Sequence, residues 1–175
     1  MCKRIIITGA PGTGKTSLID ILQKKGHACF SEISRQIIIQ QQQQQSNKTP
    51  WEDLFGFTNL VYQQTVEELH IPIHKNTFVD RGLPDTIAYL QTKSEVIPDY
   101  LLNFPFKEYY NNTVFLAPFW EEIYVGDPQR LQSSKDAIEI HNNLLQVYTA
   151  LDFKIEILPK TTLTKRIEFI QSIII

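Results

Sequence analysis

One stretch near the amino end constrains this 175-residue chain more than any other. Gly9-Ala-Pro-Gly-Thr-Gly-Lys-Thr16 matches the pattern G-x-x-x-x-G-K-[ST] without a gap. In this pattern, glycines let successive backbone amides converge on phosphate oxygens, the lysine reaches the β- and γ-phosphates, and the last hydroxyl binds Mg²⁺. We expect nucleotide contacts from Gly9, Ala10, Pro11, Gly12, Thr13, Gly14, Lys15, Thr16 and Ser17.

The residues on either side of this stretch fit the same interpretation. Lys3-Arg-Ile-Ile-Ile-Thr8 predicts a short buried strand, because isoleucine is β-branched and apolar. Residues 15–25 predict a helix with Leu18 and Leu22 on one apolar stripe. The complete motif between a strand and a helix favours a phosphate site over an ordinary glycine-rich turn.

Length and composition narrow the class of protein. A chain of 175 residues predicts a single domain over residues 1–175. A net charge of −2 gives no reason to expect nucleic acid or an anionic membrane as partner. With only Cys2 and Cys29 there is no disulfide framework, and no apolar run approaches membrane-spanning length. We therefore expect a cytoplasmic protein, and the sequence leaves its oligomeric state open.

Strand and helix patterns alternate from end to end. Further strands are predicted at residues 27–30, 76–79, 113–116 and 153–158, with helices between them. The alternation predicts an α/β fold with a parallel sheet, helices on both faces and right-handed crossovers. In such sheets ligands bind at the carboxyl ends of the strands. The residues just after each strand are therefore the informative ones.

Two local features concern the region after the second strand. Ser31 is a candidate N-cap for a helix to Ile39, and the glutamines at 40–45 indicate a helix tail that frays into a flexible loop. Thr49-Pro-Trp-Glu52 has the form of a capping box with proline at the first helical position, which predicts a helix from Thr49 to about Leu69.

Asp80 and Arg81 follow the third predicted strand. A carboxylate there can hold Mg²⁺ through water or accept a proton from an incoming hydroxyl; the structural alternative is a turn aspartate before Pro84. The planar fork of Arg81 suits substrate or transition-state phosphate, and its alternative is a surface salt bridge.

Glu32 and Arg35 lie three residues apart, on one face of the helix predicted after the second strand, and both are candidates for substrate contact. Glu32 is also a candidate general base. The alternative is that Glu32 interacts with its own helix dipole and with Arg35.

Residues at about 117–133 are aromatic, charged and rich in turn formers, which suits a lid. Arg130 lies just before a helix, where a closing arginine stabilises charge on a transferring phosphoryl group, and Lys135 is a second candidate; an ordinary surface loop is the alternative.

His141 lies on an apolar stripe, which favours packing over ligation. Since His and Cys lack metal-ligand spacing, Mg²⁺ held through nucleotide phosphates is the only metal implied.

Four stretches together resemble a family of small bacterial predicted ATPases, usually labelled an AAA-type domain, with a layout nearer to P-loop nucleoside and nucleotide kinases, including the nicotinamide-riboside kinase type. They are the phosphate loop, residues 31–38, Val79-Asp-Arg-Gly-Leu-Pro-Asp-Thr-Ile-Ala-Tyr-Leu90, and residues 114–124 with Asp127, Arg130 and Gln132 after them. The resemblance implies a three-layer P-loop NTPase fold with strand order 2-3-1-4-5, and ATP and Mg²⁺ as ligands.

By the same resemblance, Asp80 and Arg81 look like the Asp/Glu-Arg pair of nucleoside and thymidylate kinases, Arg130 like a lid arginine, and Glu32 like the acidic residue that meets the acceptor. A small-molecule kinase is the first hypothesis, with an acceptor that the sequence does not identify. An ATPase or switch acting on a protein partner is the alternative, and a non-catalytic binding module is the third. The glutamine tract departs from the family pattern at the edge of the acceptor pocket.

Overall fold

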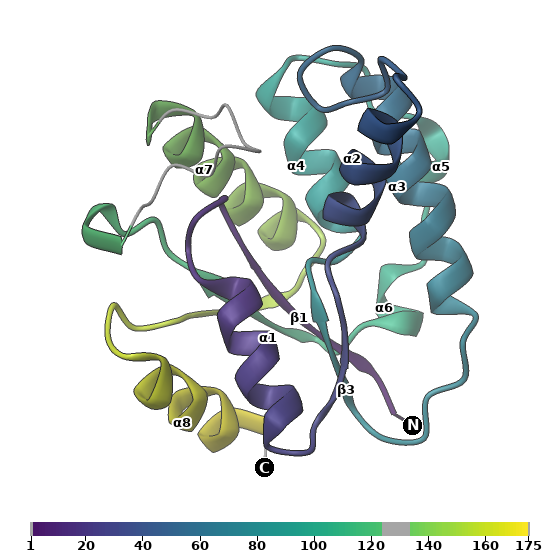
Figure 1. The fold of residues 1–175 in the computed structure, drawn as a ribbon. Coiled ribbons are helices and arrows are strands. Elements are labelled where there is room, and N and C mark those ends of the chain that lie inside the picture. Colours follow the sequence, from purple (N-terminus) through teal and green to yellow (C-terminus); the bar gives the residue numbers. More distant parts are fainter. Residues whose placement is uncertain (1, 124–133, 175) are drawn as a thin grey trace.

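The fold is known from a computed structural model that describes residues 2–123 and 134–174. Its centre is a parallel sheet of five strands in the order β2-β3-β1-β4-β5 (Figure 1). The strands are β1 (Arg4–Gly9), β2 (Ala28–Phe30), β3 (Thr77–Asp80), β4 (Thr113–Ala117) and β5 (Lys154–Ile157). The predicted α/β class and the strand order implied by the resemblance are both confirmed.

Helices cover both faces of this sheet. They are α1 (Lys15–Lys24), α2 (Ile33–Gln43), α3 (Leu54–Leu69), α4 (Pro84–Thr92), α5 (Asp99–Leu102), α6 (Phe106–Tyr109), α7 (Ser134–Ala150) and α8 (Leu163–Ile174), with a 3-10 turn, η1 (Glu121–Ile123), after β4. Figure 1 shows α1 and α8 together on one face and α3, α4 and α7 on the other.

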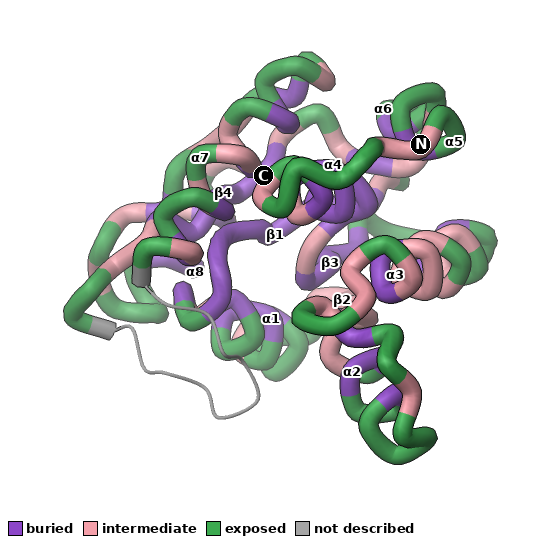
Figure 2. The backbone as a smooth tube through the Cα atoms, turned by 90° about the horizontal axis from the view of Figure 1, so that it is seen from above, coloured by how far each residue is buried: buried purple, intermediate pink, exposed green. Residues whose placement is uncertain are grey.

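The central strands are buried on both faces, as the run of isoleucines predicts. Ile5 and Ile7 of β1 pack in one apolar cluster with α1 and α8. Ile6, between them, packs in the opposite cluster with α4 and α7. Because strand side chains alternate, one strand contributes to both clusters. Figure 2 shows these strands buried at the centre of the molecule, with the exposed residues around them.

The register brings the functional segments to one edge. Ile7 of β1 pairs with Asp80 of β3, and Gly9 pairs with Ala117 of β4. The phosphate loop, the Asp80-Arg81 pair and the segment after Ala117 therefore all leave the sheet at its carboxyl edge. This is the edge at which parallel sheets of this kind bind ligands.

The helix predicted from Thr49 starts later than expected. Its first residue is Leu54, and Asp53 is the N-cap, with its carboxylate accepting a hydrogen bond from the Gly56 amide at 2.8 Å. Thr49 and Glu52 do interact, through a 3.1 Å side-chain hydrogen bond. They close a separate turn in which the Asp53 amide donates to the Thr49 carbonyl at 3.1 Å. The prediction was wrong because this turn uses the same residue pattern without continuing as a helix.

The helix before it also differs at both ends. Its N-cap is Glu32, with no side-chain capping bond, so the prediction of Ser31 as the cap is wrong. The glutamines continue the helix to Gln43 instead of fraying at Gln40, because glutamine is a good helix former and Gln41 packs inward with 8% of its surface exposed. The helix ends where Gln45 takes a positive φ of 53°.

The segment predicted as a lid is described only in part. β4 ends at Ala117, and η1 follows at Glu121–Ile123. Arg130 and the rest of residues 124–133 lie outside the described residues, so the lid stays a prediction. Among the residues that are described, no helix has both the length and the apolarity needed to cross a membrane.

Candidate functional site

The phosphate loop, residues 9–16, joins β1 directly to α1. Gly12 and Gly14 have φ values of 75° and 82°, in the left-handed region that favours glycine. Gly9 is required for a second reason: a Cβ there would lie 2.4 Å from the Ala117 carbonyl oxygen of β4. Since α1 begins at Lys15, the loop also lies at the positive end of a ten-residue helix. This backbone can accept an anion.

Lys15 is buried within the loop. Its Nζ donates to the Ala10 carbonyl at 2.8 Å, and the Thr13 hydroxyl donates to the same carbonyl at 2.8 Å. The lysine charge is thus already directed into the concave loop. A phosphate oxygen, which is charged, is a stronger acceptor for this ammonium group than a neutral carbonyl.

Asp80 lies immediately behind the end of the loop. The Thr16 hydroxyl donates to Asp80 Oδ2 at 3.0 Å. Burial raises the pKa of Asp80, and the charge of Lys15 opposes that shift. The other oxygen, Oδ1, is buried without a hydrogen-bond partner among the described residues. A hydroxyl and an unsatisfied carboxylate oxygen side by side are hard oxygen ligands, so these two residues fit Mg²⁺ held partly through water.

Arg81 is the centre of a buried ionic network. Its Nε donates to Glu32 Oε1 at 2.9 Å, and its Nη1 donates to Asp85 Oδ2 at 3.1 Å and to the Gly9 carbonyl at 3.0 Å. Burial alone would lower its pKa, but the nearby charges, including those of Glu32 and Asp85, raise it well above the usual value. The arginine therefore links β1, β3, α4 and the start of α2, and it stays charged.

Asp85, on the first turn of α4, completes the network. It accepts hydrogen bonds from the Thr8 hydroxyl at 2.7 Å and from the Tyr148 hydroxyl at 2.5 Å. Burial and the charge of Asp85 raise the pKa of Tyr148, so this phenol remains a donor. Sequence reasoning did not select Asp85. The available signal was its position four residues after Arg81, a spacing that pairs charges across a helical turn.

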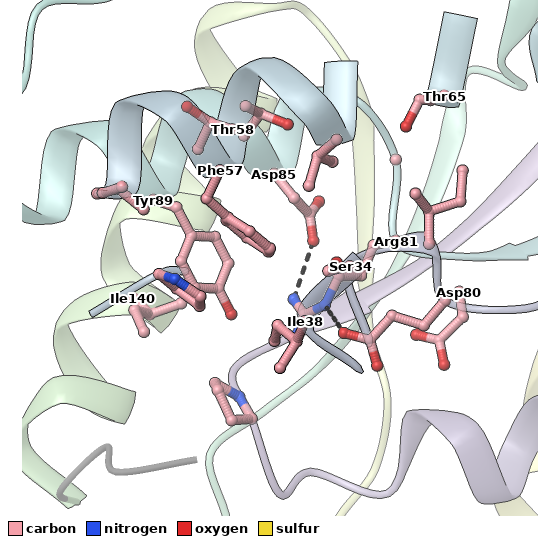
Figure 3. Close-up of a pocket in the computed structure, with 18 of the residues that line it drawn as sticks. Ser34, Ile38, Phe57, Thr58, Thr65, Asp80, Arg81, Asp85, Tyr89 and Ile140 are labelled. Carbon is pink, nitrogen blue, oxygen red and sulfur yellow. Dashed lines mark hydrogen bonds and ion pairs between the residues drawn. The ribbon is translucent and has the colours of Figure 1, made fainter. Parts of the chain in front are cut away.

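A cavity of about 240 Å³ opens beside this network. Figure 3 shows Arg81 and Asp85 in its wall, with Phe57 and Tyr89 among the rings that line it. The lining residues come from four helices and from the strand edge, and they include Pro11, Glu32, Ser34, Ile38, Leu54, Phe57, Thr58, Val61, Asp80, Arg81, Asp85, Tyr89 and Ile140. Because Pro11 belongs to the phosphate loop, the cavity begins where a nucleotide's phosphates would lie.

The structure brings together most of the candidate residues but not all of them. Glu32, Asp80 and Arg81 share the cavity wall with Pro11. Arg35 is half-buried on α2 and is not among the described residues that line the cavity, so its role in substrate contact stays a prediction.

His141 is half-buried on α7, and burial lowers its pKa. No cluster of three His, Cys, Asp or Glu side chains that could hold a metal occurs within residues 2–123 and 134–174.

Arg166 of α8 is a second residue that sequence reasoning missed. Only 1% of its surface is exposed, and it lies over the Trp120 ring at 5.2 Å. Its Nη1 donates to the Thr13 carbonyl at 3.1 Å, and its Nε donates to the Pro159 carbonyl at 2.9 Å. The side chain therefore ties the phosphate loop to the loop after β5. The signal was an arginine between apolar positions of the last helix.

Comparison with family models finds a match over residues 4–166 to a family described as an AAA domain. A search of curated proteins finds no match. The sequence resemblance to an AAA-type domain is thereby confirmed.

Solved structures share the fold at low sequence identity. A deoxyadenosine kinase from M. mycoides with bound dCTP has a TM-score of 0.71 and 17% identity, with 97% of each chain covered. The same enzyme with product dCMP and a flexible dCDP has a TM-score of 0.70 and 15% identity, with the same coverage. A thymidylate kinase from Candida albicans has a TM-score of 0.67 and 13% identity, covering 99% of this chain and 91% of that one.

Proposed function

The chain belongs to this AAA-domain family, and on that premise we propose that it is a small-molecule kinase that transfers the γ-phosphoryl group of ATP to a nucleoside-like or nucleotide-like acceptor. The nucleotide binds the phosphate loop, with Lys15 at the β- and γ-phosphates. Thr16 and, through water, Asp80 hold Mg²⁺, which neutralises charge on the phosphates when bound.

The acceptor occupies the cavity beside the loop. Its oxygen attacks the γ-phosphorus, the bond to the bridging oxygen of ADP breaks, and ADP leaves. Glu32 receives the proton of an attacking hydroxyl, and Arg81 holds the Glu32 carboxylate in place through the 2.9 Å hydrogen bond. Placing both reactants in line is the main contribution of such a site, because phosphoryl transfer needs little covalent chemistry from the protein.

One observation supports a kinase most strongly. The cavity is continuous from Pro11 of the phosphate loop, past Glu32 and Arg81, to the apolar side chains of α2 and α3. A phosphotransferase requires a second, enclosed site next to the γ-phosphate, whereas an ATPase or switch that acts on a protein requires only water there. Two solved proteins that share this fold are a deoxyadenosine kinase and a thymidylate kinase, whose names indicate a nucleoside and a nucleotide as their substrates.

Turnover against a mixed acceptor pool tests this proposal. The purified protein is incubated with ATP and Mg²⁺, alone and with nucleosides, nucleotides and vitamin-like alcohols, and the products are identified by mass spectrometry. We expect one pool member to gain a phosphoryl group as ADP appears, and the Asp80→Asn variant to lose this activity. Slow ADP formation that no pool member changes would instead favour the ATPase or switch acting on a protein partner.

A further inference from the structure

The described part of the acceptor cavity contains few cations. Within residues 2–123 and 134–174, only Arg81 and Lys93 are positively charged among the residues that line it. Lys93 follows the last residue of α4 and is exposed, so solvent screens its charge. A nucleotide acceptor brings a phosphate of about two negative charges into its site. Binding such a group needs a cation or backbone amides with free donors.

Arg81 is poorly placed to supply that charge. Only 8% of its side chain is exposed, and two of its nitrogens already donate to Glu32, Asp85 and the Gly9 carbonyl. Its guanidinium group also lies over the Tyr89 ring at 5.4 Å. Recruiting it to a phosphate would break ion pairs that are buried, which leaves Glu32 and Asp85 without their cation. The positive charge is thus matched within the protein.

Carboxylates dominate the rest of the wall. Glu32, Glu68, Asp80, Asp85 and Asp136 all line the cavity, against the two cations. Glu32 and Asp85 together carry one more negative charge than Arg81, and a like charge brought beside them in an enclosed site of low dielectric is repelled. Glu32 also stands beside the phosphate loop, where the acceptor's reacting end must lie. An acceptor phosphate at this end would face Glu32 and the γ-phosphate together.

We propose that the acceptor is an alcohol of nucleoside size that carries no phosphate before the reaction. This proposal rests on the proposed function of the same site. The hydroxyl oxygen bonds to the γ-phosphorus, its proton passes to Glu32, and ADP leaves with the electrons of the broken bond. The apolar side chains on α2 and α3, such as Ile38, Phe57 and Val61, face the uncharged ring of such a molecule.

Paired ligands test the proposal in two ways. The binding of the common ribonucleosides and 2′-deoxynucleosides, and of each matching 5′-monophosphate, is measured by calorimetry in the presence of a non-hydrolysable ATP analogue and Mg²⁺. Transfer is then measured with ATP and the same ligands by mass spectrometry. We expect at least one nucleoside to bind about 100-fold more tightly than its monophosphate, and to be converted to that monophosphate.

The two proposals can fail separately. Preferential nucleoside binding without transfer contradicts the kinase and leaves the ligand class standing. Equal or tighter binding of the monophosphates overturns the ligand class, and their conversion to diphosphates would at the same time support the kinase. A protein that binds neither member of any pair also overturns the ligand class.

A matched pair of variants tests whether the charge of the cavity wall disfavours an acceptor that carries a phosphate. Ser34 lines the cavity two residues after Glu32, whereas Gln36 on the same helix is exposed and does not line it. Ser34→Lys and Gln36→Lys add the same charge. We expect Ser34→Lys to bring the affinities for the monophosphate and the nucleoside about tenfold closer, and Gln36→Lys to leave the ratio unchanged. Equal ratios in both variants would contradict the role of cavity charge.

Discussion

The two faces of the sheet differ in what they bury. On the α1 and α8 face, a closed apolar cluster surrounds Ile5 and Ile7, and the buried charge of Arg166 donates to backbone carbonyls. On the α4 and α7 face, the apolar cluster borders a cavity and an ionic network centred on Arg81. In the first arrangement the arginine ties the phosphate loop to the loop after β5, and in the second charged side chains line an open space.

This difference matches the two tasks of a phosphotransferase. A phosphate loop binds a group that is common to every nucleotide. It can therefore be made from one contiguous motif, which here is held by a side chain of the neighbouring helix α8. An acceptor site must be shaped for a particular molecule, and the cavity proposed for it here is lined by residues of α2, α3, α4 and α7. Substitutions on each face test whether the two tasks are separated in this way.

The largest expected effect is on the α1 and α8 face of the sheet, which supports the phosphate loop. Lys15→Ala removes the ammonium group that is aimed into the phosphate loop, while the loop backbone remains. We expect ATP turnover to fall by about 10³-fold, the scale on which single charge-stabilising donors act. Turnover is measured by ADP release. Lys24→Ala, at the exposed end of α1, is the control and should keep its activity; a loss shared by both variants would contradict the assignment.

The second largest effect is expected on the α4 and α7 face, which carries the ionic network around Arg81. Asp85→Ala leaves Arg81 with one carboxylate partner and removes the acceptor of Thr8 and Tyr148. Since one member of a buried pair is deleted, the free energy of unfolding should fall by about 3–5 kcal/mol. Urea denaturation measures it. Asp20→Ala, on the exposed side of α1, should change it little, and an equally small loss for Asp85→Ala would show that the network is not structural.

Arg166→Met tests the support behind the loop. It removes two hydrogen bonds from a charged group but keeps an apolar side chain of similar length. We expect about 2 kcal/mol less stability and roughly tenfold weaker ATP binding, because the Thr13 carbonyl loses its tie to the loop after β5. Thermal unfolding and nucleotide calorimetry measure the two effects. Lys165→Met is the exposed neighbour, and ATP binding equal to that of Arg166→Met would refute the link.

The smallest expected effect is on the pH dependence of stability, through Glu68 in the cavity wall. Burial raises the pKa of Glu68 to about 7, against about 4.5 for the unfolded chain. The folded state therefore binds the proton more tightly than the unfolded state between these values. Stability should fall as pH rises from 4.5 to 7, by about 1–2 kcal/mol after allowance for solvent screening of this half-buried group.

Glu68→Gln removes the ionisation and should flatten this part of the pH profile, measured by thermal unfolding between pH 4 and pH 8. Glu67→Gln, exposed on the same helix, should keep the wild-type slope. A Glu68→Gln profile as steep as that of Glu67→Gln would contradict the assignment.

Much of the fold followed from local patterns. The isoleucines of β1 and the alternation of strands with helices predicted the parallel sheet, because these patterns depend on burial and on chain direction alone. The start of α3 was mispredicted at Thr49, since residues that cap a helix also close an isolated turn. Nothing in the local sequence decides between the two.

The candidate site divides in the same way. The loop residues and Asp80 were named because a contiguous motif and a strand end mark them. Asp85, Tyr148 and Arg166 were missed because their roles depend on contacts between elements distant in sequence: the Tyr148 hydroxyl reaches Asp85 across 63 residues, and the Arg166 guanidinium reaches Thr13 across 153. Such contacts are formed by packing and have no spacing that can be recognised in one sequence.

We propose that the phosphate loop binds ATP and that the cavity holds the acceptor. The Glu32→Gln variant tests this separation most directly, with ATP affinity and phosphoryl transfer measured on the same preparation. Glu32 lines the proposed acceptor cavity and accepts a hydrogen bond from Arg81 Nε, whereas Nη1 of that arginine donates to the Gly9 carbonyl at the start of the phosphate loop. We expect ATP affinity within about threefold of wild type and single-turnover transfer to the acceptor slower by about 10²–10⁴-fold, as for loss of a general base. Unchanged transfer, or an equal loss of ATP affinity, would contradict the separation of the two sites.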